Sequence, residues 1–361
     1  MAAILITLAC AVPPDSPGAV ATSTGKQAPP AAAAREPAAQ WSMVSDPGEL
    51  GWSKVKLRQA AAMLEDLGTA AFLVVTDGRI VFSHGPLSTR FKMHSIRKSL
   101  LSALLGISIH EGKIDPGASL RDLGIDDLSP KLTAEEKQAT VLDLLKSRSG
   151  IFHPAVHELP SMIASRPEPG SHRPGEHWYY NNWDFNALGT IFEVRAGEPI
   201  GRAFGRRIAR PIGMEDFKEE DVEYARGAQS IHPAYPFRLS ARDLARFGLL
   251  YLRGGRWGGQ QVLPEDWVRE STRAHSNTGR SGTMSGYGYM WWVATRPGIS
   301  SGRRVPNGTV TASGHGGQRL VIIPTIDTVL VHLMDTEGEE SEVGTGEFDR
   351  FMDRLMGARQ D

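Results

Sequence analysis

A serine and a lysine three residues apart can do nucleophilic chemistry when one helix carries both side chains. Ser95 and Lys98 have this spacing at the start of an apolar run that reaches Ile107. Residues three apart on a helix are neighbours, and an amine that enters an apolar environment favours its neutral form, which can accept the hydroxyl proton. The positive end of the helix dipole also favours negative charge developing at Ser95. The pair is therefore a candidate serine nucleophile with its base.

The same spacing occurs at two other places, so it is weak evidence by itself. Ser23 and Lys26 lie in a stretch rich in alanine and proline, and Ser53 is expected to cap a helix on a solvated face. Only Lys98 enters an apolar run. For Ser95 too, a plain alternative stays open, because serine at a helix start commonly caps that helix.

Two tyrosines within residues 174–193 are candidates for a proton-handling partner. The chain carries Tyr-x-Asn twice there, as Tyr179 with Asn181 and as Tyr180 with Asn182. A phenol beside a lysine ammonium is more easily ionised, so it can take a proton from the serine and then protonate a leaving group. An aromatic cluster in the core is the alternative interpretation. The residues alone do not decide which of the two Tyr-x-Asn pairs supplies the partner.

A glycine-rich turn near the C-terminus is the third candidate segment. His315, Gly316 and Gly317 precede an apolar run, Leu320 to Ile323, that is typical of a strand. Two glycines would let a substrate approach the backbone closely. In isolation the segment is equally typical of an ordinary turn before a strand.

Taken in order, these segments resemble the penicillin-binding proteins and class C β-lactamases. That family carries a pattern like Y-S-N-x-G-Y-x-L-L-G, and the positions that follow it here are Tyr180, Asn182, Phe185, Leu188 and Gly189. The resemblance therefore selects the register of Tyr180. It implies an acyl-enzyme on Ser95, with Lys98 and Tyr180 handling the proton. By the same resemblance, Asn182 would orient the lysine or the substrate carbonyl.

The glycine-rich turn resembles the K-T-G triad that begins the strand beside the active site in this family. His315 stands where the family has lysine, followed by Gly316 and Gly317. Versions without the lysine resemble the esterase and 6-aminohexanoate-dimer hydrolase branches, and the change makes recognition of a β-lactam carboxylate doubtful. The resemblance also implies that the backbone amides of Ser95 and Gln318 form an oxyanion hole.

Three functions remain open from the sequence. The favoured one is a serine hydrolase that cleaves a small ester or a linear amide. The alternatives are a β-lactamase or D-alanyl-D-alanine carboxypeptidase, and a non-hydrolytic binding protein on the same scaffold. The expected partner is a small-molecule ester, amide or β-lactam, and no metal or organic cofactor is expected.

The elements around these segments predict an α+β fold with a mostly antiparallel sheet, flanked by helices and carrying an inserted helical region. An amphipathic helix ending at Gly68 precedes a hairpin, and a second hairpin and a closing helix end the chain. The expected strands are Ala71–Thr76, Arg79–Ser83, Leu320–Ile323 and Thr328–Met334, and the closing helix is Glu347–Met356. Residues 41–361 are expected to form one catalytic domain, with an α/β part at about 41–92 and 280–361 and a mainly helical part at about 93–279.

The first 40 residues are expected to be a signal segment followed by a tether rich in alanine and proline. The apolar run from Ala2 to Val12 suits the core of a signal peptide, although no basic residue precedes Lys26. Cys10 after Leu8 and Ala9 resembles a lipoprotein cleavage site, which would attach the N-terminus to a membrane. The protein is thus expected to be exported as a periplasmic, secreted or lipid-anchored form, or cytoplasmic if this segment is not a signal.

The composition argues against two other classes of function. The 40 basic and 41 acidic residues give a formal charge of −1, which lacks the electrostatic footprint of nucleic-acid binding. A metal site among His153, His157, His172 and His177 is conceivable. However, Pro154 interrupts the first pair and no His-Glu-x-x-His motif occurs, so no metal is expected.

Overall fold

The structure is a computed structural model, and it describes most of the chain from Gln40 to Gln360. The described residues are 40–360 except 129, 281, 296–297, 301–302, 307 and 338–343. The expected signal segment and tether lie outside the described residues, apart from Gln40. None of the described helices is long and apolar enough to span a membrane.

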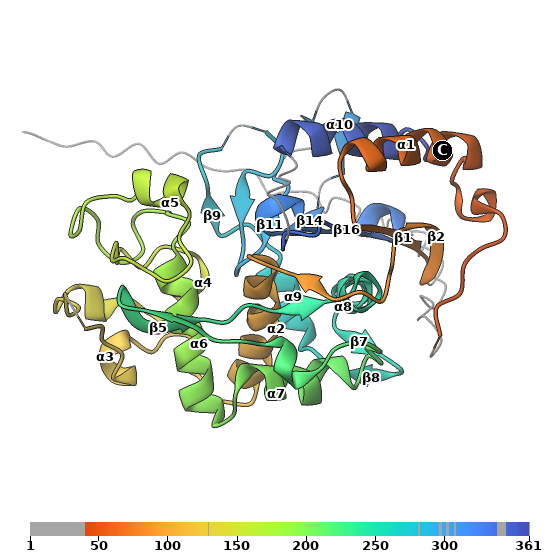
Figure 1. Cartoon of the computed structure of the whole chain (residues 1–361). Helices are drawn as coiled ribbons and strands as arrows, with labels where there is room; N and C mark the ends of the chain where they lie inside the picture. Colours follow the sequence, from red (N-terminus) through yellow and green to blue (C-terminus); the bar gives the residue numbers. More distant parts are fainter. Residues whose placement is uncertain are drawn as a thin grey trace, which may run out of the picture. The chain divides into compact units, whose positions relative to one another are not determined.

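An antiparallel sheet of eight strands forms the centre of the fold (Figure 1). Its strands, in spatial order, are β2 (Arg79–His84), β1 (Ala71–Thr76), β16 (Thr328–Leu333), β15 (Arg319–Ile323), β14 (Val310–Ser313), β11 (Trp292–Val293), β10 (Gly286–Tyr287) and β9 (Ser276–Asn277). The two ends of the described chain meet where β1 pairs with β16. The predicted α+β class, with a sheet built from both ends of the chain, is confirmed.

Helices cover both faces of this sheet. On one face, α1 (Lys54–Asp66) and α10 (Thr345–Met356) lie side by side (Figure 1). Successive residues of a strand point to opposite faces, so Phe72 and Val74 of β1 join the core under these helices, whereas Leu73 and Val75 join the core on the other face. Every residue of β1 is buried as a result.

The second face of the sheet carries the helix that begins after Ser95. Here α8 (Ala241–Leu252) packs on β1, β15 and β16, and α2 (Ile96–His110) contacts β14. Gly248 of α8 allows the close approach, because a Cβ there would lie 2.6 Å from Val329. The helix α2 also contacts α6 (Asn182–Ala196), α7 (Ile200–Phe204) and α9 (Glu265–Ser271), so most of its residues are buried on all sides. This rigid position makes α2 a suitable base for a reactive site.

The remaining elements are short and connect or flank these layers. The helices are α3 (Leu120–Leu123), α4 (Val141–Leu145), α5 (Pro160–Ala164), the 3₁₀ turns η1 (Pro47–Leu50), η2 (Glu136–Gln138), η4 (Glu219–Asp221), η5 (His315–Gly317) and η6 (Pro324–Ile326), and the π turn η3 (Gly205–Ala209). The paired strands are β3 (Phe91–Lys92) with β6 (Arg238–Leu239), β4 (Ala225–Gly227) with β5 (Ser230–Ala234), β7 (Arg256–Trp257) with β8 (Gln260–Gln261), and β12 (Gly298–Ser300) with β13 (Arg303–Val305).

The predicted elements at the two ends of the chain agree with the structure to within about two residues. The hairpin of β1 and β2 turns at Asp77 and Gly78 as expected, and Ser53 caps α1 through a hydrogen bond from the Lys56 amide.

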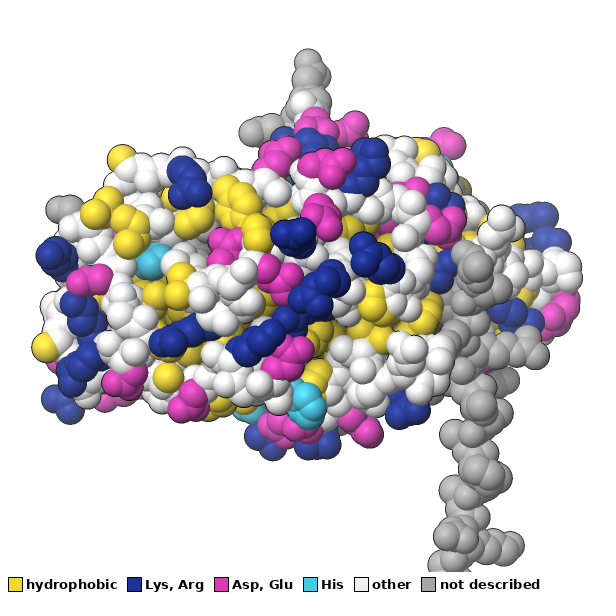
Figure 2. All heavy atoms as spheres, turned by 90° about the horizontal axis from the view of Figure 1, so that it is seen from below, with side chains coloured by type: hydrophobic (Ala, Val, Ile, Leu, Met, Phe, Trp, Pro, Cys, Tyr) yellow, Lys and Arg dark blue, Asp and Glu magenta, His cyan; other side chains and the backbone are white. Residues whose placement is uncertain are grey.

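The face of the molecule shown in Figure 2 carries acidic and basic side chains interspersed, in keeping with the nearly balanced charge of the whole sequence.

The packing of α2 against α9 generates a stability prediction. A Cβ added to Gly106 would lie 2.3 Å from the indole ring of Trp267, so Gly106→Ala must displace a rigid ring. We expect the overpacking cost of about 1–3 kcal/mol to exceed the gain in helix propensity, which is at most about 1 kcal/mol. The melting temperature of Gly106→Ala should therefore fall.

Gly205→Ala is the matched control for this substitution. Gly205 has helical dihedral angles, and its added Cβ would meet nothing closer than the Glu219 side chain at 3.4 Å. Thermal unfolding followed by circular dichroism compares the two variants. Equal melting temperatures would show that the close contact between α2 and α9 does not limit the stability of the fold.

Candidate active site

Ser95, Lys98 and Tyr180 meet at the start of α2. The Lys98 Nζ lies 2.9 Å from the Ser95 Oγ and 2.7 Å from the Tyr180 hydroxyl oxygen, and it donates a hydrogen bond to each. The Ser95 side chain makes no capping hydrogen bond, unlike Ser53 at the start of α1. The hydroxyl of Ser95 is therefore hydrogen-bonded to Lys98 and not to the backbone of the helix.

A strained turn presents Ser95 to its neighbours. The preceding residue, His94, has a φ of 46°, which L-residues seldom adopt. Contacts on both sides fix this turn, since the Met93 amide donates to the Phe237 carbonyl at 2.8 Å and the His94 Nε2 lies 2.8 Å from the Thr336 hydroxyl. The backbone thus reaches the first turn of α2 with Ser95 exposed to a cavity.

Lys98 is buried beneath the serine, with only 2% of its surface exposed. Its Nζ lies 4.2 Å from the ring centre of Tyr180 and 4.7 Å from that of Phe185. Burial, and after it the positive charge of Arg97, lowers the pKa of Lys98 well below the usual lysine value. Burial therefore favours the neutral form of the amine, which can accept a proton.

The surroundings of Tyr180 correct one sequence-based expectation. Burial raises the pKa of Tyr180, and the hydrogen bond with Ser95 and the charge of Arg97 only partly oppose this rise. The phenol was expected to ionise more easily beside a lysine ammonium, but burial disfavours the charged form of Lys98, and the indole ring of Trp292 stacks on the phenol with ring centres 5.5 Å apart. Tyr180 therefore keeps its proton in the resting site.

A buried hydrogen-bond network holds the backbone on both sides of Tyr180. The Ser147 hydroxyl donates to the carbonyl before Tyr180 and accepts from the amide of Asn181. Asp184 accepts from the Ser149 hydroxyl at 2.5 Å and from the Asn181 side chain at 2.9 Å. Burial raises the pKa of Asp184 well above the usual carboxyl value. No sequence motif predicts this network, because its members are isolated polar residues.

Asn182 begins α6 and lines the cavity in front of Ser95. Its Nδ2 donates to the His157 carbonyl rather than to Lys98, and its buried Oδ1 has no hydrogen-bond partner within the described part of the chain. The expected contact with the lysine is thus absent from the described hydrogen bonds of Asn182. The side chain is instead placed toward the space where a substrate would lie.

The glycine-rich turn lies against the backbone that precedes Ser95. Gly316 and Gly317 have φ values of 76° and 102°, which favour glycine. A Cβ on the neighbouring Gly314 would lie 2.5 Å from the Met93 carbonyl oxygen, so this position also requires a glycine. The exposed ring of His315 packs edge-on against His94 at 5.6 Å.

The side chain and backbone of Gln318 have separate roles. Its buried side chain donates a hydrogen bond to the Met334 carbonyl and accepts one from the Met334 amide, each at 2.9 Å. These two bonds hold the turn against the end of β16. Among the described hydrogen bonds, none uses the backbone N–H of Ser95 or of Gln318 as donor. Both amides therefore remain available to a negatively charged oxygen.

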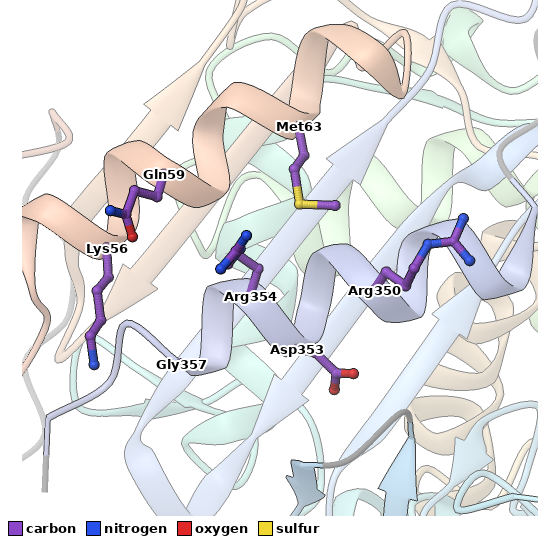
Figure 3. A pocket seen from close by; sticks show the side chains of 7 residues that line it. All are labelled: Lys56, Gln59, Met63, Arg350, Asp353, Arg354 and Gly357. Carbon is purple, nitrogen blue, oxygen red and sulfur yellow. The ribbon is translucent and has the colours of Figure 1, made fainter.

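A cavity of about 790 Å³ is lined by half of the predicted site residues. Ser95, Tyr180, Asn182 and His315 line it, whereas Lys98 lies beneath its wall. The other predicted residues, Gly316, Gly317 and Gln318, are buried next to His315. A separate cavity of about 470 Å³ lies between α1 and α10 and holds no candidate nucleophile (Figure 3).

The four histidines considered as metal ligands do not form one cluster. His153 is buried and lies 3.0 Å from Glu136, whereas His172 and His177 stack on each other at 4.2 Å. His157 lines the cavity near Asn182. Over the described residues, no group of three or more histidine, cysteine or acidic side chains is placed to hold a metal ion.

Comparison with known proteins places the chain in a family. The model of the beta-lactamase family matches residues 57–350. The chain belongs to the beta-lactamase family. An uncharacterized relative from Alkalihalophilus pseudofirmus is 22% identical over 267 residues, which cover 69% of this chain and 75% of the relative.

Several hydrolases of known structure have a fold similar to that of this beta-lactamase family member. A Bacillus anthracis protein assigned as a 6-aminohexanoate-dimer hydrolase has a TM-score of 0.60 at 20% identity, with 82% of this chain and 80% of that chain covered. A Mycobacterium bovis beta-lactamase has a TM-score of 0.58 at 17% identity, covering 82% and 97%. EstCE1, a hydrolase with promiscuous acyltransferase activity, has a TM-score of 0.60 at 16% identity, covering 87% and 99%.

These identities are low, so the structural matches establish the fold, and the family match supports a serine hydrolase at the level of the family.

Proposed function

We propose that this chain is a serine hydrolase that cleaves a small ester or a linear amide through an acyl-enzyme on Ser95. The observation that carries the proposal is the buried amine of Lys98, 2.9 Å from the Ser95 hydroxyl and 2.7 Å from that of Tyr180. A neutral amine at hydrogen-bonding distance from a hydroxyl is the arrangement that nucleophilic catalysis needs.

In this proposal the first proton is transferred to Lys98, because burial favours the neutral form of its amine. As the Ser95 Oγ bonds to the substrate carbonyl carbon, its proton moves to the neutral Nζ of Lys98, whose pKa burial lowers. The tetrahedral intermediate then loses its leaving group. Tyr180, whose pKa burial raises, donates its proton to that group and regains one from the Lys98 ammonium along their hydrogen bond. Water then attacks the acyl-enzyme, the proton transfers through Lys98 and Tyr180 run in the reverse order, and the Ser95 hydroxyl is regenerated.

The backbone amides supply the second part of the proposed catalysis. The N–H groups of Ser95 and Gln318 have no acceptor among the described hydrogen bonds, and they are proposed to hold the oxyanion of the tetrahedral intermediate. Removal of one such donor typically lowers turnover on the order of a hundredfold to a thousandfold.

Ester or linear amide substrates are favoured because His315 stands where lysine is expected in β-lactam-recognising relatives. The similar folds of EstCE1 and of the protein assigned as a 6-aminohexanoate-dimer hydrolase are consistent with this choice. The family match favours a second candidate, turnover of β-lactams or D-alanyl peptides.

A substrate panel tests the proposal. The purified protein is incubated with nitrophenyl esters of short acids, a chromogenic cephalosporin and a D-alanyl-D-alanine peptide, and intact mass follows adducts. We expect ester turnover and an acyl adduct that Ser95→Ala loses, because the hydroxyl is the nucleophile. Turnover of only the cephalosporin or the peptide would select the second candidate. No adduct from any acyl donor would point to a binding protein.

The two tyrosine registers give a sharper test of the site. Tyr180→Phe removes the hydroxyl that contacts Lys98 and should lower kcat for a nitrophenyl ester on the order of a hundredfold or more. Tyr179→Phe is the matched control, since its hydroxyl donates to the Met162 carbonyl and not to Lys98 or Ser95. It should lose about 1 kcal/mol of stability with turnover retained. Unchanged turnover in Tyr180→Phe, with a folded protein, would rule out the assigned proton route.

A further inference from the structure

Arg97 is a buried cation in the wall of the cavity that contains Ser95. Only 3% of its surface is exposed, and it lines this cavity. One guanidinium nitrogen donates to the Asn186 side chain at 2.7 Å, and the guanidinium carbon lies 4.2 Å from the ring centre of Tyr235. The other terminal nitrogen, Nη1, has no hydrogen-bond partner within the described residues.

No acidic side chain pairs with Arg97 among the described ion pairs. Other buried arginines differ in this respect, since Arg207 pairs with Glu198 and Glu111, and Arg246 pairs with Glu215. A buried charge without a counter-ion is costly to the folded protein. Its neutral partners, Asn186 and Tyr235, compensate this charge only in part.

The other charged groups of the cavity do not supply the missing anion. Glu158 lines it, but its carboxylate accepts from Arg166 at 2.5 Å and from a backbone amide. Glu223 lines it as an exposed side chain. Lys92, at the rim, pairs with Glu337 at 3.2 Å. Arg97 thus lies in the cavity wall without an acidic partner among the described ion pairs.

We propose that Arg97 determines specificity, and that it favours substrates of the serine hydrolase that carry a carboxylate. The inference rests on the proposed function and names the substrate class of the same site. A fixed charge in a poorly hydrated wall acts on a bound ligand through space, because the field is screened less there than in water. Direct contact with the guanidinium is not required.

A purely structural role gives a different expectation. Arg97 joins α2 to α6 through Asn186, and that bond alone could explain why the residue is an arginine. In that case the charge of the substrate would not affect the selectivity of the enzyme. The ratio of turnover between a charged and a neutral substrate therefore separates the two roles.

The test compares two nitrophenyl esters of equal chain length, the pentanoate and the mono-ester of glutarate. The wild-type protein should have a kcat/KM about tenfold higher for the glutarate ester, the order expected for one partly screened charge pair. Arg97→Met should remove most of this preference, and Arg97→Lys should keep most of it because the charge remains. Lys92→Gln is the matched control at the cavity rim, and it should change the ratio less than about threefold because Glu337 neutralises Lys92.

A carboxylate on the leaving group is tested in parallel, with the pentanoate ester of a carboxylated nitrophenol. A wild-type preference for either charged ester that Arg97→Met loses supports the inference. Equal kcat/KM values for charged and neutral esters in the wild-type protein overturn it, and so does a folded Arg97→Met that keeps the preference. The wild-type ratios decide the matter even if Arg97→Met does not fold. A protein that hydrolyses all esters alike overturns this inference alone, whereas one that hydrolyses none contradicts the proposed function as well.

Discussion

The burial of one amine is the constraint on which the rest of the site depends. Lys98 can reach both Ser95 and Tyr180 only because α2 lies deep in the molecule, packed against β14 and against α6, α7 and α9. The same depth removes water from the amine and lowers its pKa. Lys56 after Ser53 has the same spacing from a serine, but its side chain is exposed on a solvated helix face.

The site is assembled from segments that are far apart in the chain. Ser95 and Lys98 come from one helix, Tyr180 follows 82 residues after Lys98, and the glycine-rich turn lies at the end of β14. Each segment is fixed by groups that do no chemistry of their own. Asp184 and its partners hold the tyrosine segment, and the side chain of Gln318 ties the turn to β16. The reactive atoms therefore rest on a rigid scaffold, which is what a preorganised site requires.

The local parts of this arrangement could be predicted from the sequence. The spacing of Ser95 and Lys98 and the apolar run after them are enough to expect a buried lysine, and the hairpin at Asp77 and Gly78 follows from its turn residues. The choice of Tyr180 over its neighbour needed a resemblance, because two tyrosines in sequence carry no signal about which one faces a distant helix.

Other features could not be foreseen because they depend on tertiary contacts. Burial raises the pKa of Tyr180. The arrangement of charged side chains on neighbouring helices leaves Arg97 without an acidic partner among the described residues. The positive φ of His94 follows from contacts to Phe237 and Thr336, which are remote in sequence.

The most direct test of the account is the protonation state of Lys98, observed by nitrogen NMR of lysine-labelled protein. The Lys98→Arg variant assigns the resonance. Because the folded pKa is lowered, the Nζ should change from an ammonium to a neutral amine at a pH well below the value of about 10.4 for a free lysine. An ammonium at pH 7.5 that loses its proton near pH 10, as an exposed lysine does, would contradict the central claim.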